Sequence, residues 1–428
     1  MKRYDSYKDS GVKWLGEIPS HWEMRKMKFS FDERSDKGYP SLPLLAATQN
    51  HGVIKKEDYE NRTVEATKSL DTLKKVEKGD FVISLRSFQG GIELCYCRGI
   101  ISPAYTILRP THIKGCYFKY LGKSPIFIQL LKSMVTGIRE GQNIDYAKLR
   151  DNQLPIPSLK EQEAIANYLD SATSKIDEAI AQQQKMIDLL NERKQIIINN
   201  AVTKGLDPNV KMKPSGIDWI GDIPEHWEAR KLGSIGSTIN GVSHDSAYFG
   251  EGYPFVSYSD VYKNVSLPKT VLGLAKSSNQ ERLLFSVEKG DVFFTRTSET
   301  AEEIGFSSTC LETIENAVFA GFLIRFRPQE GLIEPSFSKY YFRAYIHRSY
   351  FVKEMNLVIR ASLSQQLLKG LPILLPPLKE QREIADYLDN QIIGIDSCIS
   401  NINKQISLLQ ERKQIIINDV VTGKVKVV

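Results

Sequence analysis

The chain carries one pattern twice, and this duplication constrains its fold more than any other feature of the sequence. Residues 10–26 read SGVKWLGEIPSHWEMRK, and residues 215–231 read SGIDWIGDIPEHWEARK. Further along, residues 159–203 and 378–422 share LKEQ, the pattern I-A-x-Y-L-D and the run ERKQIII. Because an internal repeat marks a structural unit that occurs more than once, we expect two copies of one unit.

Each copy has a short leading segment with two tryptophans, a long middle and a long final segment. The leading and final segments match closely, whereas the two middles resemble each other only faintly. A length of 428 residues also exceeds one ordinary hydrophobic core. We therefore predict four parts: a first domain with its leading segment over 1–157, a long helix over 158–204, a second domain with its leading segment over 205–376, and a second long helix with the C-terminal tail over 377–428.

The final segments have the signature of long helices. Pro157 and Pro376 stand just before them, acidic residues occupy the first turn, and neither segment contains an internal proline. Apolar residues then recur in a three-four rhythm that is typical of a coiled-coil seam. In the second copy, one row of this seam consists of Ile395, Ile402, Leu409 and Ile416.

The length of these helices bears on how they pack. A helix of about 45 residues is roughly 65 Å long, which is more than a small domain can cover. We therefore predict that the two helices pack on each other, with Gln183, Lys194 and Lys413 as polar seam residues that fix the register. The alternative is that each helix packs on its own globular half.

The two middles have the pattern of mixed α and β structure. Short β-type runs at residues 81–83 and 292–294 follow matching K-G-D turns, and helical patterns cover residues 116–134 and 337–355. Each middle is large enough for its own core. The predicted fold class is α+β, with two α/β domains joined by two long antiparallel coiled-coil helices in a pseudo-two-fold internal repeat.

Signatures of several enzyme classes are missing from the sequence. We find no glycine-rich turn suited to adenosylmethionine or to a nucleotide phosphate, and no H-E-x-x-H, G-x-S-x-G or acidic cluster for metal-assisted cleavage. The five cysteines are scattered and lack the C-x-x-C spacing of a zinc site, so we expect reduced thiols. The sequence therefore predicts no catalytic residues, no metal and no cofactor.

Composition restricts the class of partner. Hydrophobic residues make up 41% and charged residues 25%, which is the balance of a folded globular protein. No apolar stretch is long enough to span a bilayer, and the N-terminus lacks the core of a signal peptide, so we expect no membrane partner and a cytoplasmic location. A net charge of +6 suits an anionic partner.

The leading segments hold all four tryptophans of the chain and a matched pair of histidines. A catalytic histidine needs an orienting partner, which the sequence does not identify, so a packing or docking role is favoured. Tryptophan is enriched at subunit interfaces, although the simpler interpretation is that these rings anchor each leading segment to the long helices. The interface candidates are Trp14, His21, Trp22, Trp219, His226 and Trp227.

Taken together, these motifs resemble a known family. The sequences GEIPSHWEMRK and GDIPEHWEARK, each followed by P-x-L-K-E-Q, I-A-x-Y-L-D and E-R-K-Q-I-I-I, closely resemble the specificity subunits of type I restriction-modification enzymes. The resemblance covers the frame of the whole chain, with both halves in the expected order. The middles match the family only loosely, so the resemblance does not indicate a target sequence.

The resemblance implies a function and partners. In this family the middles are target recognition domains, each of which reads one half of an asymmetric, split site in double-stranded DNA, and an antiparallel coiled coil spaces them. Two modification subunits hold adenosylmethionine and methylate adenine, and restriction subunits add ATP-driven translocation and cleavage. The chain itself is then a non-catalytic subunit. A duplicated scaffold also suits two readers on one face of a duplex, separated by about one helical turn of 34–36 Å or a multiple of it.

Two loops in each half carry residue types that read base edges. Arginine pairs well with guanine, and asparagine or glutamine pairs well with adenine. One loop follows the K-G-D turn and its strand, and the other precedes the long helix. The candidate DNA-binding residues are Arg86, Ser87, Gln89, Arg139, Gln142 and Asn143 in the first half, and Arg296, Thr297, Ser298, Arg360, Ser362 and Gln365 in the second.

Two other function classes remain as alternatives at this point. The chain could be a coiled-coil scaffold that brings proteins together without reading DNA. A self-contained nuclease is disfavoured because the sequence shows no catalytic site. For any single arginine in the two loops, capping a helix or pairing with a surface acid is as good an interpretation as contact with DNA.

Overall fold

The structure is a computed structural model that describes residues 2–59, 70–136, 143–298, 303–354 and 361–427. It divides into two compact units. Unit 1 consists of residues 1–184 and 403–428, and unit 2 consists of residues 185–402. Unit 1 therefore combines both ends of the chain.

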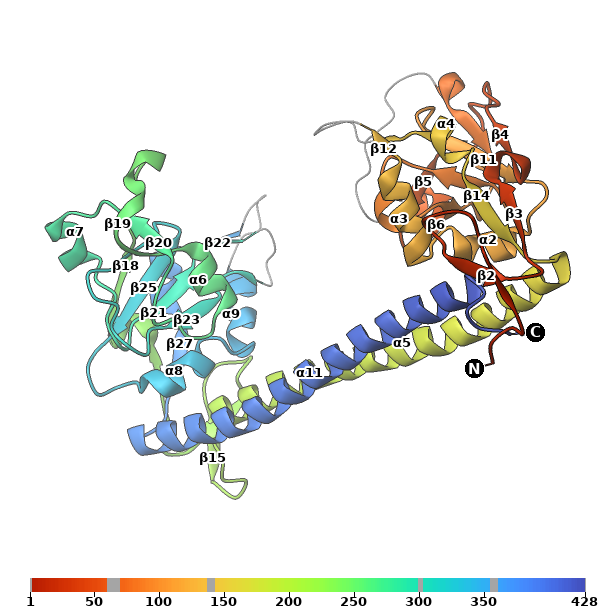
Figure 1. Cartoon of the computed structure of the whole chain (residues 1–428). Helices are drawn as coiled ribbons and strands as arrows, with labels where there is room; N and C mark the ends of the chain where they lie inside the picture. Colours follow the sequence, from red (N-terminus) through yellow and green to blue (C-terminus); the bar gives the residue numbers. More distant parts are fainter. Residues whose placement is uncertain (1, 60–69, 137–142, 299–302, 355–360, 428) are drawn as a thin grey trace. The chain divides into compact units, whose positions relative to one another are not determined.

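Two long helices, α5 (Leu159–Lys204) and α11 (Leu378–Val421), run side by side and contribute to both units (Figure 1). In unit 1, Asp177 and Gln183 of α5 bind Lys413 and Gln405 of α11, respectively. In unit 2, Lys194 of α5 binds Asp396 of α11. Residue numbers rise along one helix as those of their partners fall along the other, so the predicted antiparallel pairing is confirmed. The helices therefore pack on each other rather than only on their own globular halves.

The three polar residues predicted in the seam all take part in these contacts. Gly394 lies within α11 and does not interrupt it, because α11 is a single helix across this residue. A Cβ atom at this position would have no heavy atom within 4 Å, so glycine is not required there by packing.

Unit 1 contains a four-stranded antiparallel sheet in the order β4-β11-β8-β9. Phe81 and Ile83 of β8 face the core that contains two short helices, α2 and α3, whereas Val82 faces a second, smaller core. This alternation is the period-2 pattern of a strand that is buried on both faces. The elements of unit 1 besides α5 and α11 are β1 (Tyr7–Asp9), β2 (Glu17–Pro19), β3 (Glu23–Lys26), β4 (Phe31–Arg34), β5 (Leu45–Thr48), β6 (Gly52–Lys55), β7 (Lys74–Val76), β8 (Phe81–Ile83), α1 (Ser87–Gly90), β9 (Glu93–Leu94), β10 (Gly99–Ile101), β11 (Thr106–Pro110), α2 (Gly115–Leu121), α3 (Pro125–Ser133), β12 (Val135–Thr136), β13 (Asn143–Ile144), α4 (Tyr146–Leu149) and β14 (Gln153–Ile156).

Unit 2 repeats this arrangement with the order β18-β25-β21-β23. Val292 and Phe294 of β21 face the core that contains α8 and α9, and Phe293 faces a separate core. The sheet topology is therefore shared by two domains whose sequences hardly match. The elements of unit 2 besides α5 and α11 are β15 (Met212–Pro214), β16 (Asp222–Pro224), β17 (Glu228–Lys231), β18 (Gly236–Asn240), β19 (Phe249–Val256), α6 (Tyr258–Lys263), β20 (Gly273–Ala275), α7 (Asn279–Leu284), β21 (Val292–Thr295), β22 (Thr297–Ser298), β23 (Ser307–Thr309), β24 (Val318–Phe319), β25 (Leu323–Pro328), α8 (Pro335–Tyr341), α9 (Ile346–Glu354), β26 (Ala361–Ser362), α10 (Gln365–Gly370) and β27 (Pro372–Leu375).

The predicted strands at residues 81–83 and 292–294 are confirmed, and each predicted helical stretch is divided into two helices. In the first middle, the break between α2 and α3 falls at Ser124 and Pro125. Proline restricts the preceding residue to extended backbone, and the Ser124 hydroxyl caps α3 by accepting the backbone N–H of Phe127 at 3.4 Å.

Each middle begins and ends at the same place in its unit. The strand that closes the first leading segment, β3, pairs with β14 just before α5, and β17 pairs in the same way with β27 just before α11. The divergent part of each copy is thus a domain whose two ends are joined by a two-stranded antiparallel ribbon. Such a domain can change its sequence without disturbing the frame.

The structure also bears on membranes and metals. Within the described ranges, no helix is both long and apolar enough to cross a lipid bilayer. Among the same residues, no group of three or more His, Cys, Asp or Glu side chains is placed to hold a metal ion.

Candidate nucleic-acid interface

In unit 1, the loop after β8 presents two of the candidate residues. Arg86, which precedes the short helix α1, and Gln89, which lies within it, are both exposed. Ser87, by contrast, is buried, and its hydroxyl accepts a hydrogen bond from the backbone N–H of Ser84 at 2.8 Å. Its side chain shapes the turn and is not accessible to a ligand. Ser87 is therefore removed from the set of base-reading candidates.

Three further residues surround this loop and were not found by sequence analysis. The Gln49 amide donates to Gln89 Oε1 at 3.5 Å, and Lys123 Nζ donates to the Gln49 carbonyl at 2.7 Å. Lys123 Nζ also lies 2.6 Å from the buried carboxylate of Glu93. Burial raises the pKa of Glu93 to about 7, and the nearby Lys123 opposes this rise. The cluster ties three loops together around the exposed Gln89.

Several candidates cannot be placed at the level of side chains. Arg139, Gln142 and Arg360 lie outside the described residues. Asn143 forms the short strand β13, which pairs with β12 through Asn143 and Thr136.

In unit 2, the structure brings the two candidate loops together. Thr297 and Ser298 form β22, which pairs with β26, so that Thr297 lies opposite Ser362. The backbone N–H of Leu363 also donates to the carbonyl of Arg296 at 2.7 Å. Gln365, two residues after Leu363, accepts a hydrogen bond from the Thr238 hydroxyl at 2.9 Å. The sequence pattern paired these loops only by analogy between the halves, whereas the structure joins them through backbone hydrogen bonds.

An exposed aromatic residue adjoins this site and was missed in the sequence. The carbonyl of Phe322 accepts the backbone N–H of Arg296 at 2.9 Å, and the Phe322 side chain is 63% exposed. Its position in the run FAGFLIRF marks it only as one apolar residue among many. Its exposure could not be deduced from that run.

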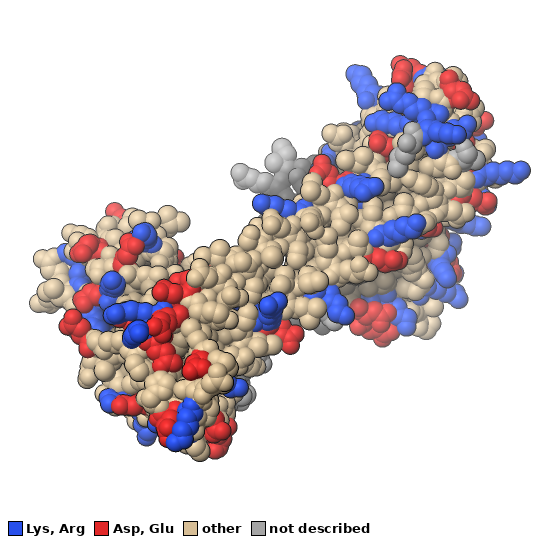
Figure 2. Space-filling view, turned by 90° about the horizontal axis from the view of Figure 1, so that it is seen from below, with Lys and Arg blue, Asp and Glu red and all other residues tan. Residues whose placement is uncertain are grey.

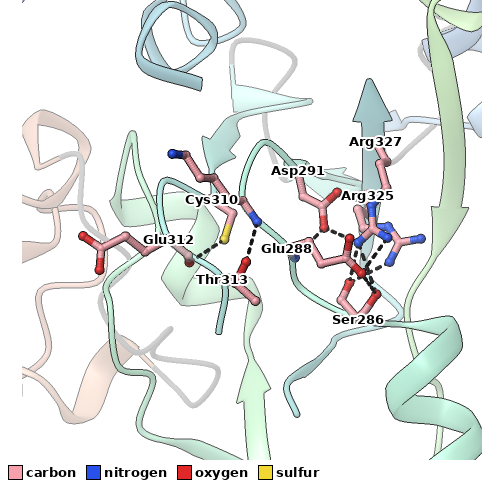
Figure 3. A network of polar contacts seen from close by, with 9 residues as sticks. Ser286, Glu288, Asp291, Cys310, Glu312, Thr313, Arg325 and Arg327 are labelled. Atoms are coloured by element: carbon pink, nitrogen blue, oxygen red, sulfur yellow. Dashed lines mark hydrogen bonds and ion pairs between the residues drawn. The ribbon is translucent and has the colours of Figure 1, made fainter. Parts of the chain in front are cut away.

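The K-G-D turns fix the start of the strands that lead to these loops. In unit 2, the buried carboxylate of Asp291 accepts two hydrogen bonds from Arg327, at 2.6 and 2.7 Å, and one from the backbone N–H of Glu288 at 2.8 Å (Figure 3). In unit 1, Asp80 accepts from Arg34 at 2.8 Å. Arg327 lies on β25 but Arg34 lies on β4, so the two domains stabilise the same turn with arginines from different strands.

A buried cysteine completes each of these turns. Cys95 Sγ donates to the carbonyl of Cys97 at 2.8 Å, and Cys310 Sγ donates to the carbonyl of Glu312 at 3.0 Å (Figure 3). Burial raises the pKa of both Cys95 and Cys310 to about 12. Both residues are free thiols that pack beside the turn.

The leading segments anchor to the long helices, which corrects the interface prediction for two of the six residues. Trp22 and Trp227 are fully buried, so neither ring is available to another subunit. Trp22 shares a core with Ile417 and Val420 of α11, and Trp227 shares one with Ile198 and Val202 of α5. Each leading segment therefore packs on the end of the helix from the other copy.

The remaining interface candidates are partly exposed. His21 and His226 bind Glu161 and Glu380 at 3.1 and 2.8 Å, and each histidine keeps about half of its side chain accessible. The half-buried rings of Trp14 and Trp219 lie against Phe127 and Tyr350, with ring centroids 5.9 and 5.8 Å apart. These contacts hold the leading segments in place and leave the interface role of the four residues as a proposal.

On the face that Figure 2 shows, the surface of unit 2 does not form a continuous basic groove. There, Lys and Arg side chains are interspersed with Asp and Glu. A phosphate backbone would favour a surface of one sign. No surface of a single charge therefore marks a phosphate-binding groove on this face of unit 2.

Comparison with known proteins agrees with this architecture. The family described as "Type I restriction modification DNA specificity domain" matches residues 224–408. The putative type I restriction enzyme MjaX specificity subunit of Methanocaldococcus jannaschii is 27% identical, and the alignment covers 98% of each chain. The chain is therefore similar over its whole length to a specificity subunit of a type I restriction enzyme, and residues 224–408 match the DNA specificity domain of that family.

Further similar proteins match less of the chain. The StySPI specificity subunit of Salmonella potsdam is 25% identical over 74% of this chain and 67% of its own. A solved chain from a structural study of complex assembly and conformational transition of the type I R-M system superposes with a TM-score of 0.70 at 16% identity. The match covers 95% of this chain and 99% of that chain, and it shows that the two share a fold.

Proposed function

We propose that this chain is a specificity subunit that reads a two-part DNA site and brings modification and restriction subunits to it. The observation that carries the proposal is the pair of domains, which share one sheet topology and one turn but have divergent sequences. A shared frame with different loops is what two readers of different sequences need. The chain itself supplies binding and not chemistry, as expected for a non-catalytic subunit.

Base contacts in the second half-site are assigned to the joined loops of unit 2. Arg296, Ser362 and Gln365 lie on adjoining segments there, and the exposed ring of Phe322 is next to Arg296. Arg86 and Gln89 take the corresponding place in unit 1. Arginine and glutamine can each make two hydrogen bonds to one base edge, so these residues supply most of the discrimination between bases.

Two modification subunits are assigned to the long helices. Leu189 and Ile196 of α5 are half exposed, and so are their counterparts in the repeat, Leu408 and Ile415 of α11. Exposed apolar side chains at heptad spacing suit an added helix from a partner. Unit 1 and unit 2 each carry one such stripe, which supports a stoichiometry of two. A location in the cytoplasm follows from the DNA substrate.

The test is to map methylated adenines in cells with and without this chain. We expect a split motif that disappears when the chain is deleted. Each middle lies between the two strands of one ribbon, β3–β14 or β17–β27. Replacing one middle by that of another specificity subunit should change one half of the motif and leave the other half intact. A motif that is unaffected by deletion would contradict the proposal.

A binding assay separates this function from that of a protein scaffold that does not read DNA. The purified chain with its modification subunit should bind duplexes with an affinity that falls steeply as salt rises, because phosphate contacts release counterions. Selection from random duplexes should enrich a two-part sequence. Methylation or cleavage by the lone chain would also overturn the proposal.

A further inference from the structure

The two units hold their leading segments with the same carboxylate, but only unit 1 uses it fully. In unit 1, Glu161 Oε1 accepts from Trp22 Nε1 at 2.9 Å and from the Tyr4 hydroxyl at 2.7 Å, while Oε2 binds His21. In unit 2, the counterpart Glu380 accepts from Trp227 at 3.0 Å and from His226 at 2.8 Å, both through Oε2.

The difference lies in the tyrosine. Tyr4 is buried, its ring lies 5.5 Å from that of His21 and 6.0 Å from that of Trp22, and the Lys426 ammonium is 5.9 Å from the ring centroid. Burial, together with the hydrogen bond to Glu161, raises the pKa of Tyr4. The phenol is therefore a permanent hydrogen-bond donor that closes the carboxylate off from water.

Unit 2 has no such residue at the matching place. Counting back from the paired strands β1–β2 and β15–β16, whose registers correspond, the counterpart of Tyr4 is Asn209. Asn209 is exposed, and its backbone N–H donates to Asp207 Oδ1 at 2.9 Å. Among the described residues, Oε1 of Glu380 accepts no hydrogen bond, and the Glu380 side chain is 23% exposed, against 8% for Glu161.

A cleft lies beside His226 and Glu380 in unit 2. It has a volume of about 350 Å³, and its lining includes His226, Glu380, Leu206, Val210 and Pro377. Lys204 and Lys379 stand at its wall, as Lys426 stands over Tyr4 in unit 1. Ammonium groups near a ring face stabilise an aromatic ring electrostatically. Asp207 and Glu383 also line the cleft, and Lys379 lies 3.7 Å from Glu383. The cleft therefore combines apolar walls with charged groups of both signs and the Glu380 carboxylate.

We propose that this cleft of unit 2 receives a tyrosine side chain of a modification subunit, whose hydroxyl donates to Glu380 Oε1. The occupant is a phenol because the repeat supplies the same carboxylate, histidine and tryptophan around a phenol in unit 1. It comes from another chain because the side chain of Asn209 is too short to supply a phenol. The inference rests on the proposed function, and it makes the two modification subunits bind unequally, since unit 1 fills its own site.

In the first test, N-acetyl-tyrosinamide is titrated into the full chain as a probe. Binding is monitored by the NMR signal of the Trp227 indole. We expect saturable shifts of the Trp227 signal and none with N-acetyl-phenylalaninamide, which lacks the hydroxyl. Asn209→Tyr should fill the cleft from within and abolish the shifts, whereas Asn209→Ser should not. Equal shifts with both probes, or shifts that persist in Asn209→Tyr, would overturn the assignment.

The second test measures assembly with the modification subunit by calorimetry. Wild-type chain should bind two copies with unequal affinity, and Asn209→Tyr should weaken one of the two steps at least tenfold. Asn209→Ser, as the matched control, should leave both steps unchanged. Unchanged assembly by Asn209→Tyr, with adenine methylation intact, would sink this inference and leave the proposed function standing. Failure of the wild-type chain to bind any modification subunit would sink both.

Discussion

The ammonium group of Lys413 lies 2.7 and 2.6 Å from the two carboxylate oxygens of Asp177 across the paired helices of unit 1. The counterparts of these residues in the repeat, Lys194 and Asp396, form the same pair in unit 2 at 2.7 and 2.9 Å. Each ion pair therefore fixes one and the same antiparallel register, and the duplication of the sequence is visible as a duplication of a single contact.

Removing the ion pair between Lys413 and Asp177 should affect the register of the two helices more than the stability of the protein. Both pairs are partly exposed, so a double-mutant cycle of Lys413→Ala and Asp177→Ala should give a coupling of about 0.5 kcal/mol in urea unfolding. Changing both Lys194 and Lys413 to glutamate places like charges opposite each other and should lower the unfolding temperature clearly more than the two alanine changes. Lys404→Ala, an exposed lysine on α11, is the control and should have no effect. Additive effects of Lys413→Ala and Asp177→Ala would contradict the pairing.

The buried carboxylate of Glu161 should be more important for stability than its counterpart Glu380. Glu161→Ala leaves the Trp22 and Tyr4 donors without an acceptor in a closed core, at a cost of about 3 kcal/mol in free energy of unfolding. Glu380→Ala should cost less, because water can reach the more exposed site. Urea denaturation of the two variants measures both costs. Equal losses would show that the two carboxylates do not differ as their exposure indicates.

The stability of unit 1 should depend on the protonation of Glu93. Burial raises its pKa in the folded state to about 7, above the ordinary value of 4.5, so the folded state binds more protons than the unfolded state between these two values. The contribution of Glu93 to stability therefore falls as pH rises from 4.5 to 7, by roughly 3 kcal/mol, and is constant above that. Glu93→Gln should remove this fall. If the free energy of unfolding changes with pH in the same way for the wild type and for Glu93→Gln, the raised pKa of Glu93 is ruled out.

Single arginine changes should each affect one half-site. Arg86→Ala and Arg296→Ala should each weaken specific DNA binding by about 1 to 3 kcal/mol and relax the base preference in only one half of the motif. Lys211→Ala removes a cation from the leading segment of unit 2 and serves as the control, with base preference unchanged. Binding to sequence-randomised half-sites distinguishes these outcomes. A uniform loss for all sequences would mean that the arginines contact phosphates.

Thiol reactivity should follow burial. Cys116 and Cys398 are exposed, whereas Cys95 and Cys310 are buried with pKa values raised to about 12. At neutral pH a disulfide reagent should therefore modify Cys116 and Cys398 quickly and spare the buried pair until the protein is unfolded. Mass spectrometry of the labelled peptides checks this order. Fast labelling of Cys310 would mean that the turn shown in Figure 3 opens readily in solution.

The frame of the molecule was predictable because its signals are local and occur twice. Heptad spacing predicted the helix pair, and the polar seam residues Gln183, Lys194 and Lys413 proved to be the residues that bind across it. The K-G-D turns marked β8 and β21 correctly because a tight turn before an apolar run is a strong strand signal.

The details of the site depend on contacts that sequence patterns do not contain. Ser87 matched a base-reading loop by position, yet its hydroxyl is used within the turn. The arginines that bind Asp80 and Asp291 come from different strands, so aligning the halves could not identify both. Trp22 and Trp227 suited a subunit interface by residue type, but their burial depends on the far ends of helices that lie distant in sequence.

The composition of unit 1 from both ends of the chain has a consequence for biosynthesis. The core around Trp22 includes Ile417 and Val420, which are synthesised after all of unit 2. The domain that is synthesised first is therefore the last to be completed, and until then its tryptophan pocket lacks one wall. A chain that terminates before the end of α11 therefore exposes apolar surface of unit 1, which quality-control proteases can recognise.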